Sequence, residues 1–206
     1  MASPATDPSS SPKPAAPRGE ARKACITEAA LTVIARVGPD GLTHRLVAAE
    51  AGLPLAATTY WFASKEDMVR AALEFAIERD LDHVDALRAD SRAWTKKTVA
   101  AELARYVERT CTERRECAVV DGALWLEALR RPELRPIAKR WVDDYTDVLQ
   151  EVLRNVGAPA SHDDAELLGA AIDGIISHHL VVAGPFDRAT VTKQLGRLTA
   201  ALVKAG

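Results

Sequence analysis

The sequence has no excess of basic residues. Its 206 residues include 27 Lys and Arg against 29 Asp and Glu, which gives a formal net charge of −2, and the pI is about 6.2. A protein that holds nucleic acid through its overall charge needs a broadly basic surface. Any DNA contact must therefore come from a local surface with a specific geometry.

Cysteines are few, and long apolar runs are missing. Cys25, Cys111 and Cys117 form no CxxC pair, which favours a reduced compartment. No apolar run approaches the roughly 18 residues that a membrane span needs. The N-terminus also lacks a basic segment followed by an apolar one. We therefore expect a cytoplasmic protein without a membrane partner.

The motifs of common enzyme classes are missing as well. The sequence contains no GxSxG, HExxH, GxGxxG or P-loop pattern, and its 5 His residues form no cluster with an acid and a nucleophile. His178 and His179 follow Asp173, but adjacent residues on a helix point about 100° apart and do not readily face one ion. The sequence thus predicts no catalytic activity, no cofactor and no metal site.

The N-terminal segment 2–17 is rich in Pro, Ser and Ala and has almost no large apolar side chains. Such a segment cannot offset the entropy of ordering, so residues 1–18 are predicted to be a disordered tail. Its basic residues suit a phosphate-contacting arm, and a solvated tail without a role is the alternative. The basic residues of the tail and of the segment just after it are Lys13, Arg18, Arg22 and Lys23.

From about residue 20 onward, apolar residues recur at helical spacing, and no stretch alternates with a period of two. The sequence therefore predicts an all-α fold with about nine helices. Their expected ranges are roughly 20–37, 43–51, 55–61, 64–88, 95–114, 117–130, 134–156, 162–183 and 187–204.

Two short predicted helices form a helix-turn-helix. Thr43 suits the cap of the first, and Gly52 suits a left-handed turn after it. Such a motif places its second helix in the DNA major groove while the first helix crosses the backbone. Val47, Ala48 and Ala51 are expected to face the core of the module. The residues expected to point outward from the second helix are Ala56, Ala57, Thr58, Tyr60 and Trp61.

These residues resemble the N-terminal domain of the TetR family of transcriptional regulators. The resemblance covers about residues 20–73, including Ala29-Ala30 and the ten-residue spacing from Gly52 to Phe62. The matching segments are Gly41-Leu-Thr43, Val47-Ala-Ala, Ala51-Gly-Leu53 and Phe62-Ala-Ser-Lys65-Glu-Asp-Met. The resemblance implies a DNA-binding domain at 19–65 and a ligand-binding and dimerisation domain at 66–206.

The resemblance also implies roles for individual residues. Thr43 would cap the second helix near a phosphate, His44 and Arg45 would contact the DNA backbone or a base, and Lys65 would bind a phosphate. An arginine can bind the O6 and N7 atoms of guanine together, so Arg45 is the candidate for reading a base. Ordinary solvated charge is the alternative for Arg45 and Lys65.

The sequence departs from the family pattern at the end of the second helix. The family usually has Leu-Tyr-x-His-Phe there, whereas this chain has Thr58-Thr59-Tyr60-Trp61-Phe62. The usual phosphate-binding tyrosine is thus Thr59, whose hydroxyl can still bond a phosphate, and Tyr60 can take part of that role. We expect Phe62 to pack in the core. Core packing is also the alternative to DNA contact for Trp61.

The last two helices suit dimerisation, which the resemblance also implies. In the last helix Val191, Leu195, Leu198 and Leu202 repeat at intervals of 4, 3 and 4 residues. The alternative is that both helices complete a monomeric core. The small residues of the preceding helix are Gly169, Ala170, Ala171, Gly174, Ser177 and Ala183.

Such proteins hold a ligand among the helices of the second domain, in large apolar pockets with a few polar groups. Plain core packing is the alternative for each aromatic candidate. Tryptophans would be natural platforms for an aromatic or cationic ligand. The predicted ligand-binding residues are Tyr106, Asp121, Trp125, Trp141, Tyr145, Asp173 and His178.

Together these features predict a homodimeric repressor that a small-molecule effector releases from a palindromic double-stranded operator. A two-fold dimer would set its recognition helices about 34–36 Å apart, or at a small multiple of that spacing. The alternative is a helical protein-binding adaptor whose helix-turn-helix no longer reads DNA.

Overall fold

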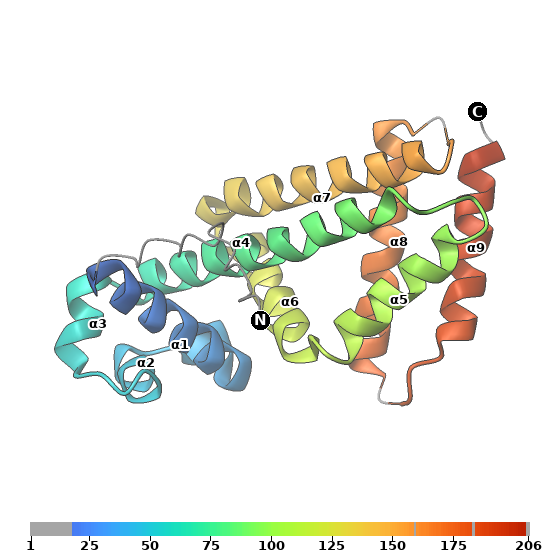
Figure 1. Ribbon diagram of the computed structural model, residues 1–206. Helices are drawn as coiled ribbons and strands as arrows, with labels where there is room; N and C mark the ends of the chain where they lie inside the picture. Colours follow the sequence, from blue (N-terminus) through green and yellow to red (C-terminus); the bar gives the residue numbers. More distant parts are fainter. Residues whose placement is uncertain (1–17, 159, 183, 205–206) are drawn as a thin grey trace, which may run out of the picture.

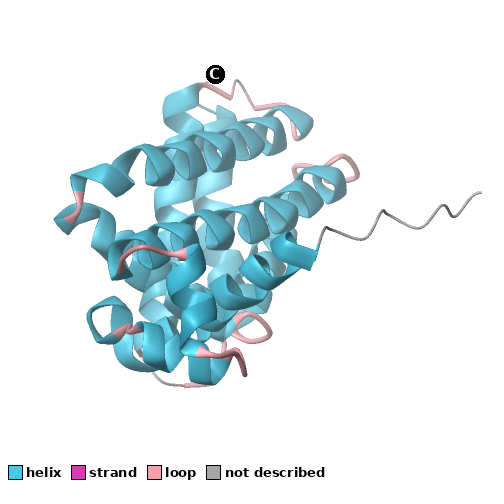
Figure 2. Cartoon of the chain, turned by 90° about the vertical axis from the view of Figure 1, so that its left-hand side faces the viewer, coloured by secondary structure: helices cyan, strands magenta, loops and turns pink. Residues whose placement is uncertain are grey.

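The computed structural model describes residues 18–158, 160–182 and 184–204. Within these ranges all regular structure is helical (Figure 2). The all-α expectation is therefore confirmed, whereas the predicted tail at residues 1–18 lies almost entirely outside the described residues.

The described part has nine α-helices and one short 3-10 helix (Figure 1). Helices α1 to α3 form one end of the molecule, α4 extends from them alongside α7, and α8 and α9 lie at the other end. The helices are α1 (Arg18–Gly41), α2 (His44–Glu50), α3 (Leu55–Trp61), α4 (Lys65–Ser91), α5 (Val99–Cys111), α6 (Arg115–Arg130), η1 (Pro132–Leu134), α7 (Arg135–Asn155), α8 (His162–Val181) and α9 (Arg188–Lys204).

Two helix boundaries differ from the expected ones for local reasons. Helix α1 is broken at Gly38, whose φ of 73° is not helical, and one further turn follows through Gly41. Helix α5 begins at Val99 rather than near residue 95, because the Thr98 hydroxyl accepts a hydrogen bond from the Thr95 backbone N–H at 2.9 Å. This contact closes a turn before the helix.

Two hydrophobic clusters form the core. The first joins α1, α2 and the first half of α4 to residues of α6 and the start of α7, among them Val120, Leu124 and Ala138. The second lies among α5, α7, α8, α9 and the end of α4. The first cluster therefore crosses the expected domain boundary at residues 65 and 66, and α6 packs directly against the helices of the DNA-binding module.

The apolar stripe of α9 packs within its own chain, and dimerisation through the last two helices stays a prediction. Val191, Leu195 and Leu202 are at most 5% exposed, and α9 packs mainly against α5. Gly169 of α8 also faces inward, because a Cβ there would lie 3.2 Å from Leu149. A repeat of leucines marks a buried stripe, but the repeat does not say which helix covers it.

Helix α8 instead leaves one face open. Leu167 is 52% exposed and Val181 is 84% exposed, and Ala170, Gly174 and Ser177 between them are also exposed. These five residues recur at helical spacing along α8. We call them the α8 face.

Candidate DNA interface and ligand cavity

Helices α2 and α3 are held as a helix-turn-helix by short local contacts. The Thr43 hydroxyl accepts a hydrogen bond from the Leu46 backbone N–H at 3.2 Å and caps α2. Gly52 has a φ of 63° at the turn that follows α2, a left-handed conformation that glycine adopts without strain. The turn joins α2 to α3 in the arrangement that reads a DNA groove.

The outer surface of this module carries several of the predicted contact residues. Thr43 and Arg45 are exposed at the start of α2, and Ala56 and Thr59 are exposed on α3. Tyr60 is 79% exposed, the largest exposed fraction of any aromatic side chain in the described residues. The surface thus offers a guanidinium, hydroxyls and an aromatic ring to solvent.

Thr58 does not belong to this surface, which corrects the prediction that it contacts DNA. It is fully buried, its hydroxyl donates to the Leu55 carbonyl oxygen at 2.9 Å, and it lies 3.3 Å from Nδ1 of His44. The neighbouring His44 is half-buried. Thr58 therefore supports the module from inside and fixes the ring of His44.

The expected outward orientation of Ala57 and Trp61 is only partly correct. Both side chains are half-buried and pack against the first hydrophobic cluster. The Trp61 ring leaves little space above Gly19 of α1, where a Cβ would lie 3.4 Å from it. Tyr60 meets this ring edge-on, with centroids 5.1 Å apart. Trp61 thus anchors α3 to α1, and it braces Tyr60.

Replacing Thr58 with Val is expected to lower the free energy of unfolding by about 1 kcal/mol, because one buried hydroxyl hydrogen bond is lost. Thr59→Val is the matched control, since its hydroxyl bonds carbonyl oxygens of the same helix but is exposed. We expect Thr59→Val to unfold like the wild type. Urea unfolding of the three proteins measures the difference, and equal stability of both variants would contradict the buried role of Thr58.

Lys65 begins α4 beside this surface. Its Nζ donates a hydrogen bond to the Asp40 carbonyl oxygen at 2.6 Å. An ammonium group has three N–H donors, so two remain for other acceptors. The adjacent Ser64 hydroxyl accepts from the Asp67 backbone N–H at 3.0 Å. The start of α4 is thereby fixed to the turn before α2.

A cavity of about 240 Å³ lies among α4, α5, α6, α7 and α8. Its wall is mainly apolar, with Leu73, Ile77 and Ile176 among the lining residues. Trp125 of α6 and Trp141 of α7 meet in the wall with ring centroids 5.6 Å apart. Two indole rings are therefore available to a ligand.

Three carboxyl groups and one arginine line the cavity, and a second arginine pairs with one of these carboxyl groups. Asp80 pairs with Arg114 at 2.6 Å, and Asp121 pairs with Arg79 at 3.1 Å. Burial and the nearby Asp80 carboxylate outweigh Arg79 and raise the pKa of Asp121 to about 8. Asp173 stays exposed at its outer side, yet the groups packed around its carboxyl raise its pKa to about 6 by desolvation.

Comparisons with known proteins agree on one family. The model described as "Bacterial regulatory proteins, tetR family" matches residues 26–72. The model described as "Tetracyclin repressor-like, C-terminal domain" matches residues 94–201, more than half of the chain. The chain belongs to the TetR family. It is therefore a DNA-binding transcriptional regulator.

Solved structures of TetR-family proteins share this fold. Multidrug binding protein EbrR complexed with ethidium is 34% identical with a TM-score of 0.68, and the match covers 86% of this chain and 97% of that chain. A TetR-family member from Streptomyces coelicolor A3 is 33% identical with a TM-score of 0.69 and the same coverage. The HTH-type transcriptional regulator BetI of Burkholderia thailandensis is 25% identical over 181 residues, which are 84% of this chain and 89% of that protein.

Most of the residues predicted to bind ligand in this TetR-family chain surround the cavity. Tyr106, Asp121, Trp125, Trp141 and Asp173 line it. Their contact with a ligand stays a prediction.

Two of the predicted ligand residues lie elsewhere. Tyr145 is only 4% exposed and stacks behind Trp141 with centroids 5.2 Å apart. His178 is exposed, and it is not among the lining residues, which corrects its assignment to the pocket. His178 follows Ser177, which lines the cavity. Because a helix turns about 100° from one residue to the next, the His178 side chain points in a different direction from that of Ser177.

Sequence reasoning missed Asp80 and Arg114, which also line the cavity. A signal for Asp80 was present, because it falls at helical spacing between the apolar residues Ile77 and Val84 of α4. A charged residue inside a buried stripe indicates a polar site. No comparable pattern marks Arg114, which precedes α6.

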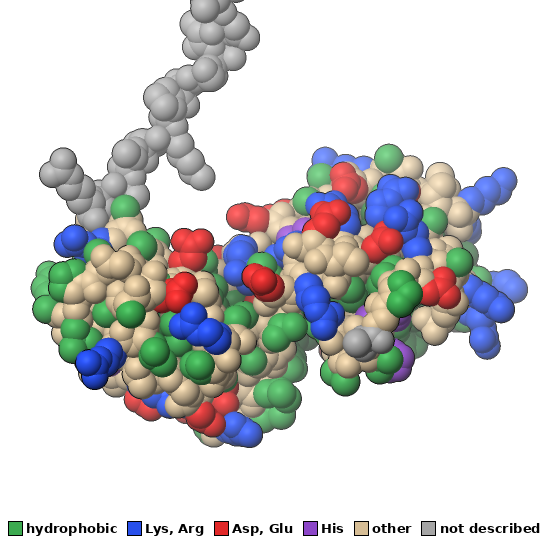
Figure 3. All heavy atoms as spheres, turned by 90° about the horizontal axis from the view of Figure 1, so that it is seen from below, with side chains coloured by type: hydrophobic (Ala, Val, Ile, Leu, Met, Phe, Trp, Pro, Cys, Tyr) green, Lys and Arg blue, Asp and Glu red, His purple; other side chains and the backbone are tan. Residues whose placement is uncertain are grey.

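No helix in the described part is long and apolar enough to cross a membrane. Within the same residues, no three His, Cys, Asp or Glu side chains are grouped to hold a metal ion. On the face shown in Figure 3, Lys and Arg side chains lie scattered among acidic and apolar ones rather than in one basic patch.

Proposed function

We propose that this regulator is a homodimeric repressor that reads a palindromic operator and releases it when an aromatic cation enters the cavity. Two helices carry the proposal, because α4 and α6 belong to the first hydrophobic cluster, which they share with the DNA-binding module. The same two helices form part of the wall of a cavity that contains aspartate and tryptophan side chains. The adaptor alternative is not favoured, because the related proteins are transcriptional regulators.

Residues 19–65 supply the DNA contacts in this proposal. Arg45 reads a base, and Thr43, Thr59 and Lys65 bind phosphates beside it. The small exposed Ala56 lets α3 approach the groove, and Tyr60 contacts the backbone next to it. His44, Ala57 and Trp61 support this surface from partly buried positions.

Residues 66–206 supply the dimer interface and the effector site. The α8 face is the proposed interface, because small and apolar side chains in a helical row allow close packing of a second copy around a two-fold axis. Ser177 belongs to this face, Asp173 lies on the same helix beside Gly174, and both residues also line the cavity. The dimer would therefore cover part of the cavity's rim.

The proposed effector class follows from the chemistry of the cavity. Indole rings attract cations over their faces, and carboxylates compensate positive charge. Asp121 and Asp173 are placed to do so beside Trp125 and Trp141. EbrR, which is 34 to 35% identical, has been solved with ethidium and with malachite green. We therefore propose planar or near-planar aromatic cations as effectors of this chain.

The test measures binding of the purified protein to the DNA upstream of its own gene, with and without malachite green. We expect a protected palindrome and a loss of protection when the dye is added. The double variant Asp121→Asn and Asp173→Asn should bind the same DNA and keep it in the presence of dye. Equal release of the wild type and this variant would reject the cavity as the effector site.

A further inference from the structure

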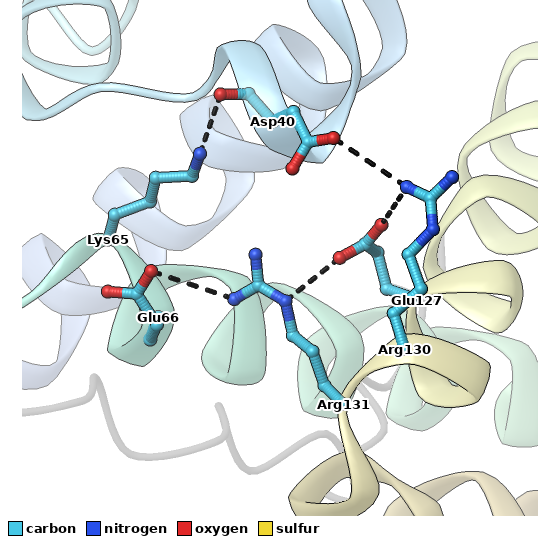
Figure 4. A network of polar contacts seen from close by, with 6 residues as sticks. All are labelled: Asp40, Lys65, Glu66, Glu127, Arg130 and Arg131. Atoms are coloured by element: carbon cyan, nitrogen blue, oxygen red, sulfur yellow. Dashed lines mark hydrogen bonds and ion pairs between the residues drawn. The ribbon is translucent and has the colours of Figure 1, made fainter.

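We infer that Glu127 is a positioning residue for DNA binding: through Arg130 and Arg131 it fixes the turn before α2 and the start of α4 to the helix that forms the cavity wall. This inference rests on the proposed function for its link to an effector. Asp40, Lys65, Glu66, Glu127, Arg130 and Arg131 make up this contact network, which we call the Glu127 cluster (Figure 4).

Glu127 is a charged residue in a buried position. Its side chain is 3% exposed and belongs to α6. One carboxylate oxygen lies 2.9 Å from Nε of Arg131, and the other lies 3.2 Å from an Arg130 guanidinium nitrogen. A buried carboxylate is costly unless it is paired and hydrogen-bonded. Both arginines satisfy this carboxylate, Arg131 from a largely buried position with 17% of its side chain exposed and Arg130 from the surface with 70% exposed.

Both arginines then extend toward the DNA-binding module. Arg130 lies 3.6 Å from the Asp40 carboxylate in the turn before α2, and Arg131 lies 3.9 Å from the Glu66 carboxylate at the start of α4. Lys65 closes the arrangement, since its Nζ donates to the Asp40 carbonyl oxygen at 2.6 Å. Figure 4 shows how the side chains of this cluster connect the end of α6 to these two segments.

The cluster is thus connected to a proposed phosphate contact and to the segment that precedes Arg45. Asp40 lies three residues before Thr43, the cap of α2. A displacement of Arg130 would change the position of this turn, and the hydrogen bond from Lys65 would carry the same displacement to the start of α4. Glu127 touches no DNA in this arrangement, and it acts through other residues.

Helix α6 connects this cluster to the cavity. Ala118, Asp121 and Trp125 of α6 line the cavity, whereas Val120 and Leu124 of the same helix pack in the first hydrophobic cluster. Glu127 follows Asp121 by about 9 Å along the helix axis. Because a helix moves nearly as one body over this length, a ligand that displaces the wall at Asp121 also displaces Glu127.

The exposure of the outer side chains indicates what the cluster does. Asp40 and Glu66 are 77% and 63% exposed, and exposed ion pairs add little to stability. The outer pairs therefore do not hold the module folded, which its hydrophobic cluster does. Their geometry is set from the buried end, so the cluster defines an orientation that a small movement of α6 can change.

The test compares Glu127→Gln with the wild type in three measurements. The glutamine keeps the size of the side chain but loses the charge that holds both arginines. We expect affinity for malachite green without DNA to stay unchanged and hydrogen exchange to increase at residues 39–43. We expect the ratio of operator affinities without and with dye to fall by about three- to tenfold. A residue with only a structural role would change unfolding without changing this ratio.

Two further variants keep the inference testable if Glu127→Gln is poorly folded. The double variant Asp40→Asn and Glu66→Gln removes only the exposed partners, and we expect the same fall in the ratio. Glu102→Gln is the matched control, because Glu102 pairs with Arg105 at 2.7 Å within α5. A wild-type ratio in both cluster variants would overturn the inference, whereas a wild type that ignores the dye would reject the proposed function instead.

Discussion

Replacing Arg45 with Ala is expected to lower operator affinity by at least tenfold, on the order of 1–3 kcal/mol for each half-site. Arg45 is exposed in the first turn of α2, and its guanidinium can bond two acceptors on one base. Loss of a base contact relaxes specificity at that position, whereas loss of a phosphate contact weakens binding to all sequences and reduces the salt dependence. Titrations against operators with single base-pair changes, at several salt concentrations, separate these cases.

Two variants are the controls for this prediction. Lys65→Ala should weaken binding to every operator variant about equally and reduce the salt dependence, as expected for a phosphate contact. Arg105→Ala removes a guanidinium that is exposed on α5, far from the module, and should bind DNA as the wild type does. The assignment of Arg45 to a base would be wrong if Arg45→Ala weakened all operator variants equally.

The local features of the DNA-binding module could be predicted because they depend on neighbours in sequence. Thr43 caps a helix whose first N–H groups are only three residues away, and Gly52 adopts the φ that a short turn requires. Thr58 was assigned wrongly because α3 has only seven residues. Two turns of helix are too short for the hydrophobic period to distinguish its inner face from its outer one.

Features that depend on tertiary packing were harder to predict. The stripe of α9 was recognised as a packing surface, but only the structure shows that α5 of the same chain covers it. Asp80 and Arg114 are 34 residues apart in sequence, and Glu127 contacts a turn near residue 40 only through Arg130. No local pattern encodes such pairs, since their partners are brought together by the packing of α4, α5 and α6.

The affinity of the cavity for ethidium is expected to increase by about tenfold from pH about 6 to about 8. The pKa of Asp121 is raised to about 8 in the free protein, first by burial and then by Asp80, so its carboxyl is protonated at neutral pH. A bound cation stabilises the carboxylate and lowers this pKa. Binding then releases a proton, and affinity rises with pH until the free carboxyl is itself ionised, near pH about 8.

Ethidium suits this experiment because its quaternary charge does not titrate. Asp121→Asn should bind it with an affinity that rises by at most about twofold over this range, because only Asp173, with a pKa of about 6, still titrates there. Asp173→Asn is the matched variant: the pKa of Asp173 is about 6, so its removal should weaken binding but preserve the rise. Calorimetry in two buffers of different ionisation enthalpy measures the released proton directly. An affinity that is flat or falls with pH in the wild type would show that the cation does not bind beside Asp121.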